Sequence, residues 1–108
     1  IHRYGMFYCP MYEALTRVVI DLSGRPYLVY DVNLKVERIG AFETEMLREF
    51  LYALSVHGRK NLHVTNLYGV NAHHIVESIF KALGHALKEA VRIDGDETSV
   101  LSTKGVLE

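Results

Sequence analysis

The chain has 108 residues, of which 49% are hydrophobic and 23% are charged, and its formal net charge at pH 7 is −1. A chain of this length can bury the core of a single domain, and the absence of an apolar run of about 18 residues argues against a membrane-spanning class. The small net charge gives no general attraction to nucleic acid or anionic lipid. We therefore expect one soluble domain over residues 1–108, without nucleic acid or membrane as a partner.

The single cysteine, Cys9, excludes an internal disulfide and suits a reducing compartment, although a small buried apolar role explains it equally well. No signal peptide is evident at the start of the sequence. Because the first residue is Ile1 and not methionine, we expect a chain that was processed or cut from something longer.

Three strands are expected in the first third of the chain. Residues 4–10 are aromatic and predict a strand that enters a turn at Cys9-Pro10-Met11. Residues 15–22 are rich in β-branched side chains, and the turn signal Ser23-Gly24-Arg25-Pro26 separates them from another apolar segment, residues 26–33. These two segments are predicted to form an antiparallel hairpin, followed by a polar connection or strand extension over residues 35–40.

The remaining elements are a helix, a strand and a second helix. Residues 43–56 have the apolar spacing of a helix with one buried stripe, ending at Gly58 as its C′ residue. That stripe consists of Met46, Leu47, Phe50, Leu51 and Leu54. Residues 61–67 predict a short strand with Leu62 and Val64 on one side. The second helix is expected from residue 72 to about residue 91, before a loop at 94–98. Its core stripe consists of Val76, Ile79, Phe80, Leu83, Leu87 and Ala90.

This order, β-β-β-α-β-α, predicts an α+β domain of two layers. We expect an antiparallel or mixed sheet with both helices packed on one of its faces.

The segment from Gly69 to Lys81 is the richest in chemically active side chains. Asn71 is a favourable N-cap, so His73 and His74 should lie in the first turn of the second helix. Adjacent helical residues diverge by about 100°, so these two imidazoles naturally face two different metal ions. Glu77 follows His73 by four residues and His74 by three, so it can complete either coordination sphere. A solvated cap region with an ordinary surface pair between Glu77 and Lys81 is the alternative interpretation.

The run Gly-x-Asn-x-His-His-x-x-Glu-Ser-x-Phe-Lys resembles the second His-His-x-x-Glu motif of the imidazoleglycerol-phosphate dehydratases. Three other segments resemble the same family, namely Arg3-Tyr4-Gly5, Ser23-Gly24-Arg25-Pro26-Tyr27 and Ser102-Thr103-Lys104-Gly105-Val106. The family is built from two similar halves, and the resemblance covers only the second, C-terminal half. It implies two Mn²⁺ ions per active site, whereas the ligand types alone would also accept zinc or iron.

The resemblance also implies the roles of individual residues. The implied metal ligands are Glu49, His73, His74 and Glu77, with His73, His74 and Glu77 also counted as catalytic. Periodicity alone would make Glu49 a solvated carboxylate at the rim of the helix. The residues implied to bind the substrate phosphate are Arg3, Arg25, Lys81, Ser102 and Lys104.

The implied activity is the manganese-dependent dehydration of D-erythro-imidazoleglycerol phosphate to imidazoleacetol phosphate in histidine biosynthesis. The implied partners are the phosphate substrate and either the missing N-terminal half or further copies of the chain, in a metal-dependent homo-oligomer. The implied location is cytoplasmic, or plastid in a plant. One alternative is an inactive metal-binding half-domain that serves assembly. Another is an RNA-binding domain, against which the lack of a basic face and of stacking aromatics argues.

Overall fold

The computed structural model describes residues 3–93, so the loop expected at 94–98 and both Ser102 and Lys104 lie outside the described residues. The elements are β1 (Tyr4–Met11), β2 (Ala14–Asp21), β3 (Tyr27–Asp31), β4 (Arg38–Ile39), β5 (Phe42–Glu43), α1 (Glu45–His57), β6 (Asn61–Tyr68) and α2 (Ala72–Ala90). The predicted order of strands and helices is confirmed. The one addition is the short β4–β5 pair, which occupies the expected polar connection.

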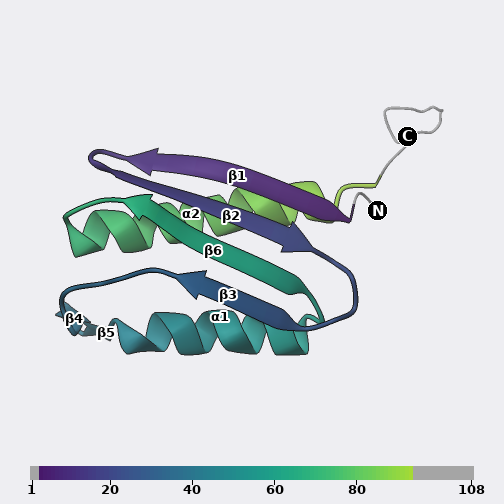
Figure 1. Ribbon diagram of the computed structural model, residues 1–108, viewed down its shortest axis with the longest axis horizontal. Coiled ribbons are helices and arrows are strands. Elements are labelled where there is room, and N and C mark those ends of the chain that lie inside the picture. Colours follow the sequence, from purple (N-terminus) through teal and green to yellow (C-terminus); the bar gives the residue numbers. More distant parts are fainter. Residues whose placement is uncertain (1–2, 94–108) are drawn as a thin grey trace.

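The main sheet has the strand order β1-β2-β6-β3 (Figure 1). Strands β1 and β2 form an antiparallel hairpin, and β6 runs antiparallel to β2 and parallel to β3. The predicted hairpin between residues 15–22 and 26–33 is therefore wrong. The predicted turn at Cys9-Pro10-Met11 is also wrong, because those residues belong to β1 and the chain reverses at Tyr12 and Glu13.

Burial explains why β6 separates β2 from β3. Leu62 and Val64 of β6 are fully buried, as are Val18 and Ile20 of β2. A strand with such apolar side chains gains most from a central position, where both of its neighbours shield it. Parallel pairing of β3 with β6 also needs a crossover connection, which α1 provides.

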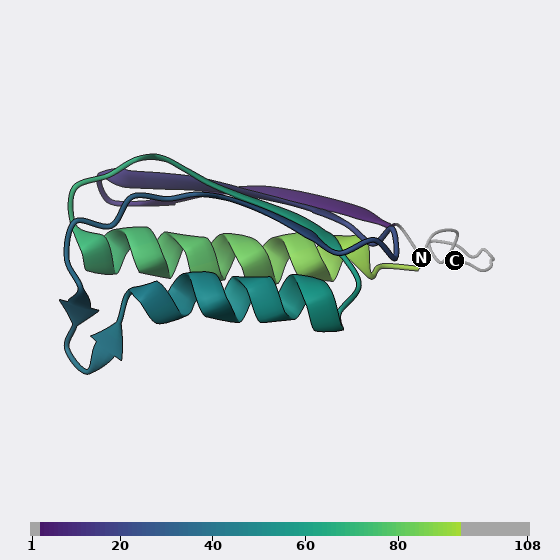
Figure 2. The ribbon, with the colours of Figure 1, turned by 60° about the horizontal axis from the view of Figure 1, so that its bottom comes forward.

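Both helices cover the same face of the sheet, as predicted, with α1 and α2 side by side beneath the strands (Figure 2). The side chains between the layers form one apolar core. Leu47 and Leu51 of α1 and Ile79 of α2 are fully buried there. The predicted two-layer α+β architecture is confirmed.

Three aromatic or sulfur-containing side chains predicted as core lie largely outside it. Met46, Phe50 and Phe80 are 51%, 47% and 41% exposed. The Phe50 and Phe80 rings contact each other across the two helices, with their centroids 5.8 Å apart. The apolar stripe of each helix is therefore wider than the part of the helix that the sheet covers, and the outer edge of the stripe faces away from the sheet.

The end of α1 also differs from the prediction. Gly58 has φ −86° and caps the helix in a right-handed conformation, and the residue with positive φ is Arg59, at 51°. Gly58 is needed for space, because a Cβ atom there would collide with the Lys60 side chain and approach the Leu54 carbonyl. Among the described residues, no helix is long and apolar enough to cross a membrane.

Candidate metal and phosphate site

The start of α2 has the predicted cap. Asn71 has an extended backbone, with φ −84° and ψ 119°, and its side-chain oxygen accepts a hydrogen bond from the backbone N–H of His74 at 3.1 Å. The backbone N–H of Ile75 donates to the Asn71 carbonyl at 3.0 Å, which closes the first helical turn. His73 and His74 are therefore both held in that turn.

One face of α2 brings His73, Glu77 and Lys81 together. His73 Nε2 lies 3.5 Å from Glu77 Oε1, and Lys81 Nζ lies 3.4 Å from Glu77 Oε2. All three side chains are at least 40% exposed, so their polar atoms are open to a ligand. This arrangement follows from the i, i+4 spacing of the three residues on a helix.

His74 points elsewhere. Its ring is nearly perpendicular to that of His73, at 89°, with the centroids 6.4 Å apart. It stacks instead on Tyr12 of the β1–β2 turn, at a centroid distance of 4.8 Å, and contacts Glu13. The sequence allowed Glu77 to serve either histidine, and the structure places it beside His73.

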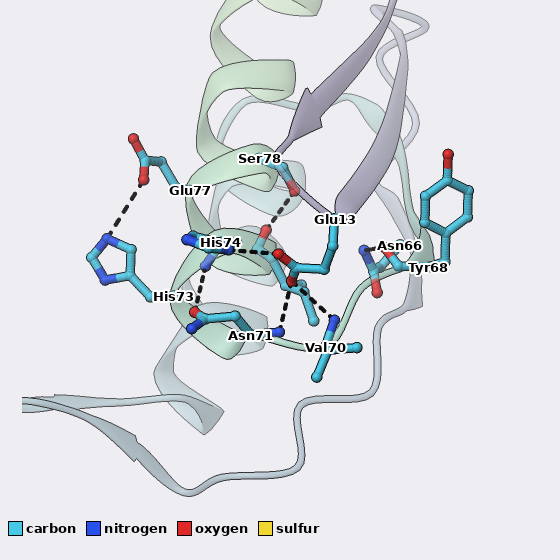
Figure 3. Close-up of polar contacts among 10 residues, drawn as sticks. Glu13, Asn66, Tyr68, Val70, Asn71, His73, His74, Glu77 and Ser78 are labelled. Atoms are coloured by element: carbon cyan, nitrogen blue, oxygen red, sulfur yellow. Dashed lines mark hydrogen bonds and ion pairs between the residues drawn. The ribbon is translucent and has the colours of Figure 1, made fainter.

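Glu13 was not identified from the sequence. Its Oε2 atom accepts hydrogen bonds from the backbone N–H groups of Val70, at 3.1 Å, and Asn71, at 2.7 Å, while its Oε1 atom lies 2.7 Å from His74 Nδ1. Figure 3 shows the carboxylate reaching from the β1–β2 turn into the start of α2. These bonds lower the pKa of Glu13 from 4.5 to about 2, and the bond from the Asn71 N–H contributes most, followed by the contact with His74.

Two sequence signals could have pointed to Glu13. Helix α2 has no acidic residue in its first turn, although negative charge is favourable there. Glu13 also lies in a two-residue turn whose strands bring it back to the helix, but this second signal required the correct pairing of β1 with β2.

Glu49 lies apart from the histidine motif. It borders a hollow with Tyr30, Asn33 and Arg48, whereas His73 and Glu77 border another hollow of about 300 Å³. The walls of that second hollow are otherwise apolar, from Ile39, Phe42, Val76 and Phe80. Within residues 3–93, no three His, Cys, Asp or Glu side chains are grouped closely enough to hold a metal ion.

The two described arginines implied to bind phosphate lie at the other end of the sheet. The backbone N–H of Arg3 donates to the carbonyl of Ala90, at the last residue of α2, about 25 Å along the helix from His73. Arg25 follows β2 in the connection to β3, and the register of β1 against β2 puts that connection beside Tyr4. Lys81 alone of the described phosphate candidates lies near the histidines.

The donors at the start of α2 suit a divalent ion in their chemistry but not in their number. Imidazole nitrogen and carboxylate oxygen are good ligands for ions such as Mn²⁺. The structure supplies them as one His73–Glu77 pair and, separately, the His74 ring nitrogen that does not contact Glu13. Each group could hold part of a coordination sphere, and other ligands would have to complete it.

Comparison with known proteins identifies the family. The family model described as imidazoleglycerol-phosphate dehydratase matches residues 1–87. The chain belongs to this family. Among curated relatives, the imidazoleglycerol-phosphate dehydratase of Heliobacterium modesticaldum is 59% identical over 108 residues, which cover 99% of this chain and 55% of the relative. That of Paracoccus denitrificans is 52% identical, with the same coverage.

Solved structures of the family share the fold. The imidazoleglycerol-phosphate dehydratase of Staphylococcus aureus superimposes with a TM-score of 0.81 at 46% identity, covering 82% of this chain and 52% of that one. The enzyme of Pyrococcus furiosus, solved in complex with (S)-C348, gives a TM-score of 0.79 at 40% identity, covering 91% and 56%. The chain thus spans about half the length of the relatives that it matches.

Proposed function

We propose that this chain supplies one half of a manganese-dependent imidazoleglycerol-phosphate dehydratase. The enzyme would convert D-erythro-imidazoleglycerol phosphate to imidazoleacetol phosphate in histidine biosynthesis. The observation that best supports this proposal is the arrangement at the start of α2, where His73 pairs with Glu77 and His74 faces away from both. Two diverging donor groups on one helical turn suit a site with two ions.

In this proposal different residues of the chain bind metal, transfer a proton and bind the anionic part of the substrate. His73 and Glu77 would hold one ion, and His74 would contribute to another. Glu49, which borders a separate hollow, would add a carboxylate only to a site completed by another polypeptide. Bound Mn²⁺ would supply Lewis-acid polarisation of the nitrogens of the substrate ring. Glu77 would also carry a proton, and the exposure of its carboxylate beside His73 supports this role. Lys81 provides a positive charge for an anionic part of the ligand.

The active site would be shared between this chain and another polypeptide. Arg3 lies at the far end of α2 from His73, so one small substrate cannot contact both residues of the same chain. Within residues 3–93, each donor group at the start of α2 also lacks the ligands needed to complete a coordination sphere. We therefore propose that the remaining residues come from the unmatched part of the enzyme or from further copies of this chain, in a metal-dependent homo-oligomer.

The decisive experiment is an assay of imidazoleacetol phosphate formation by the metal-free chain after addition of Mn²⁺. The chain is tested alone and mixed with the part of the Heliobacterium modesticaldum relative that it does not match. Turnover is expected in the mixture, and Glu77→Gln should lower it at least about 100-fold, as expected for loss of a general acid or base. Glu89→Gln, on the same helix but at its other end, is the matched control and should retain activity.

Absence of turnover in the mixture, when both parts are folded and bind Mn²⁺, would contradict the catalytic proposal. The alternative function is an inactive metal-binding half-domain that drives assembly. It is favoured by one observation, namely that residues 3–93 contain no group of three metal-binding side chains. Both readings predict Mn²⁺-dependent growth of the assembly in light scattering, and product formation separates them, because the alternative predicts that growth without product.

A further inference from the structure

The contact between Glu13 and His74 determines which imidazole nitrogen is available to a ligand. An ionised carboxylate has only acceptor atoms, so the 2.7 Å contact between Glu13 Oε1 and His74 Nδ1 requires a proton on Nδ1. A neutral imidazole carries one N–H, so Nε2 then keeps its lone pair. Of the two ring nitrogens, Nε2 becomes the one that can bind a metal ion.

Two features of the fold hold the carboxylate in this place. Its Oε2 atom is fixed by the backbone N–H groups of Val70 and Asn71, at 3.1 and 2.7 Å, so the group cannot turn freely away from the helix. The turn that presents it has Tyr12 at φ 55°, a conformation that is uncommon for a large residue. The Tyr12 ring stacks on the His74 ring and limits its rotation.

We propose that Glu13 is a positioning residue, which holds the His74 imidazole as its Nδ1–H tautomer and so directs Nε2 outward as a metal ligand. The direction of Nε2 toward a metal rests on the proposed function, whereas the tautomer depends only on this chain. A carboxylate that orients a ligating histidine in this way commonly affects metal affinity 10- to 100-fold.

The tautomer is measured first, in the metal-free 108-residue chain labelled with ¹⁵N-histidine. Long-range ¹H–¹⁵N correlation at mildly alkaline pH, where an imidazole is neutral, distinguishes a protonated from an unprotonated ring nitrogen. We expect a protonated Nδ1 and an unprotonated Nε2 for His74. The opposite tautomer, or a mixture like that of a free imidazole, would overturn the proposal.

Glu13→Gln then tests the cause. Its amide oxygen can still accept from the N–H groups of Val70 and Asn71, but its NH₂ group would face His74 Nδ1 and favour the Nε2–H tautomer. We expect the tautomer to invert and the affinity for Mn²⁺, followed by electron paramagnetic resonance of the free ion, to fall about 10- to 100-fold. The control is Glu89→Gln, because Glu89 Oε1 also accepts from a backbone N–H, that of Met6 at 2.9 Å, but at the other end of α2.

Weakened backbone hydrogen bonds alone would not reproduce this result. They would lower thermal stability in either Glu variant without inverting the His74 tautomer. An inverted tautomer with unchanged Mn²⁺ affinity would refute the role of Glu13 in presenting Nε2. If the wild-type chain bound no Mn²⁺ even when mixed with the unmatched part of the relative, the metal assignment in the proposed function would fail, and the NMR comparison would still decide whether Glu13 sets the tautomer.

Discussion

Gly69 links β6 to the start of α2, and its replacement by alanine should disturb the fold at the candidate site. Gly69 has φ 156°, and a Cβ atom there would lie 2.9 Å from both Ala14 Cβ and Ile75 Cγ1. Ala14 and Ile75 are almost fully buried, so neither can move aside into solvent. Alanine would therefore meet both an unfavourable backbone conformation and a crowded core.

The expected cost of Gly69→Ala follows from these two terms. A strained backbone position costs about 1–3 kcal/mol. An extra methyl group in a packed core costs about 1–3 kcal/mol. Because partial relaxation is shared between the two, we expect the free energy of unfolding to fall by about 2–4 kcal/mol, a large part of the 5–15 kcal/mol typical of a domain. Urea unfolding followed by circular dichroism measures it.

Gly84→Ala is the matched control for this substitution. Gly84 lies within α2, is exposed, and a Cβ atom there would have no neighbouring atom within 4 Å. Alanine should therefore stabilise the helix by up to about 1 kcal/mol. A neutral surface substitution changes the free energy of unfolding by no more than about 0.5 kcal/mol. A change this small for Gly69→Ala, together with the expected gain for Gly84→Ala, would refute the steric reasoning about the β6–α2 connection.

Two further predictions concern the surroundings of the site. The pKa of Glu13 is lowered from 4.5 to about 2, so its hydrogen bonds stabilise the fold above pH 4.5, and this contribution should be lost as the pH falls toward 2. NMR titration of the Glu13 carboxyl group measures this pKa, and a value near 4.5 would contradict the contacts. Thr16 Oγ1 and Ser78 Oγ lie 2.7 Å apart and are fully buried, so Ser78→Ala should cost about 1–3 kcal/mol by leaving the Thr16 hydroxyl without this partner. The double variant with Thr16→Val should recover part of that loss in urea unfolding, and additive losses would argue against a coupled pair.

The parts of the fold that the sequence predicted correctly depend on neighbours along the chain. The bounds of α2 follow from Asn71 and from a periodic apolar stripe, and the His73–Glu77 pair follows from helical spacing alone. Leu62 and Val64 of β6 were placed on one side by simple alternation, and both are buried. Such signals lie within a few residues of the structure they determine.

The parts that it missed depend on residues far apart in the chain. Turn signals at Ser23-Gly24-Arg25-Pro26 showed that the chain reverses, but not that β6 would insert between β2 and β3. Glu13 meets His74 only because β1 pairs with β2, and 61 positions separate the two residues. Phe50 and Phe80 were predicted as core because an apolar stripe shows how much of a helix is hydrophobic, not how much of it a sheet covers.

The ion pair of Arg3 bears on its proposed role at the phosphate. Arg3 Nε lies 2.8 Å from Asp21 Oδ1, and the guanidinium also contacts the Tyr4 ring, 5.0 Å from its centroid. These contacts hold the side chain at the end of the sheet away from His73. Half of the Arg3 side chain is exposed, and solvent screens an ion pair of this kind so that it contributes little to stability.

An approaching phosphate would therefore lose little by competing with Asp21. A phosphate carries more negative charge than one carboxylate and accepts the planar fork of an arginine in the same bidentate manner. The Asp21 contact can thus orient Arg3 before binding without preventing it from turning to a substrate. Since Arg3 and His73 lie at opposite ends of α2, the proposed function requires this arginine and the histidines that bind the same substrate to come from different copies or halves.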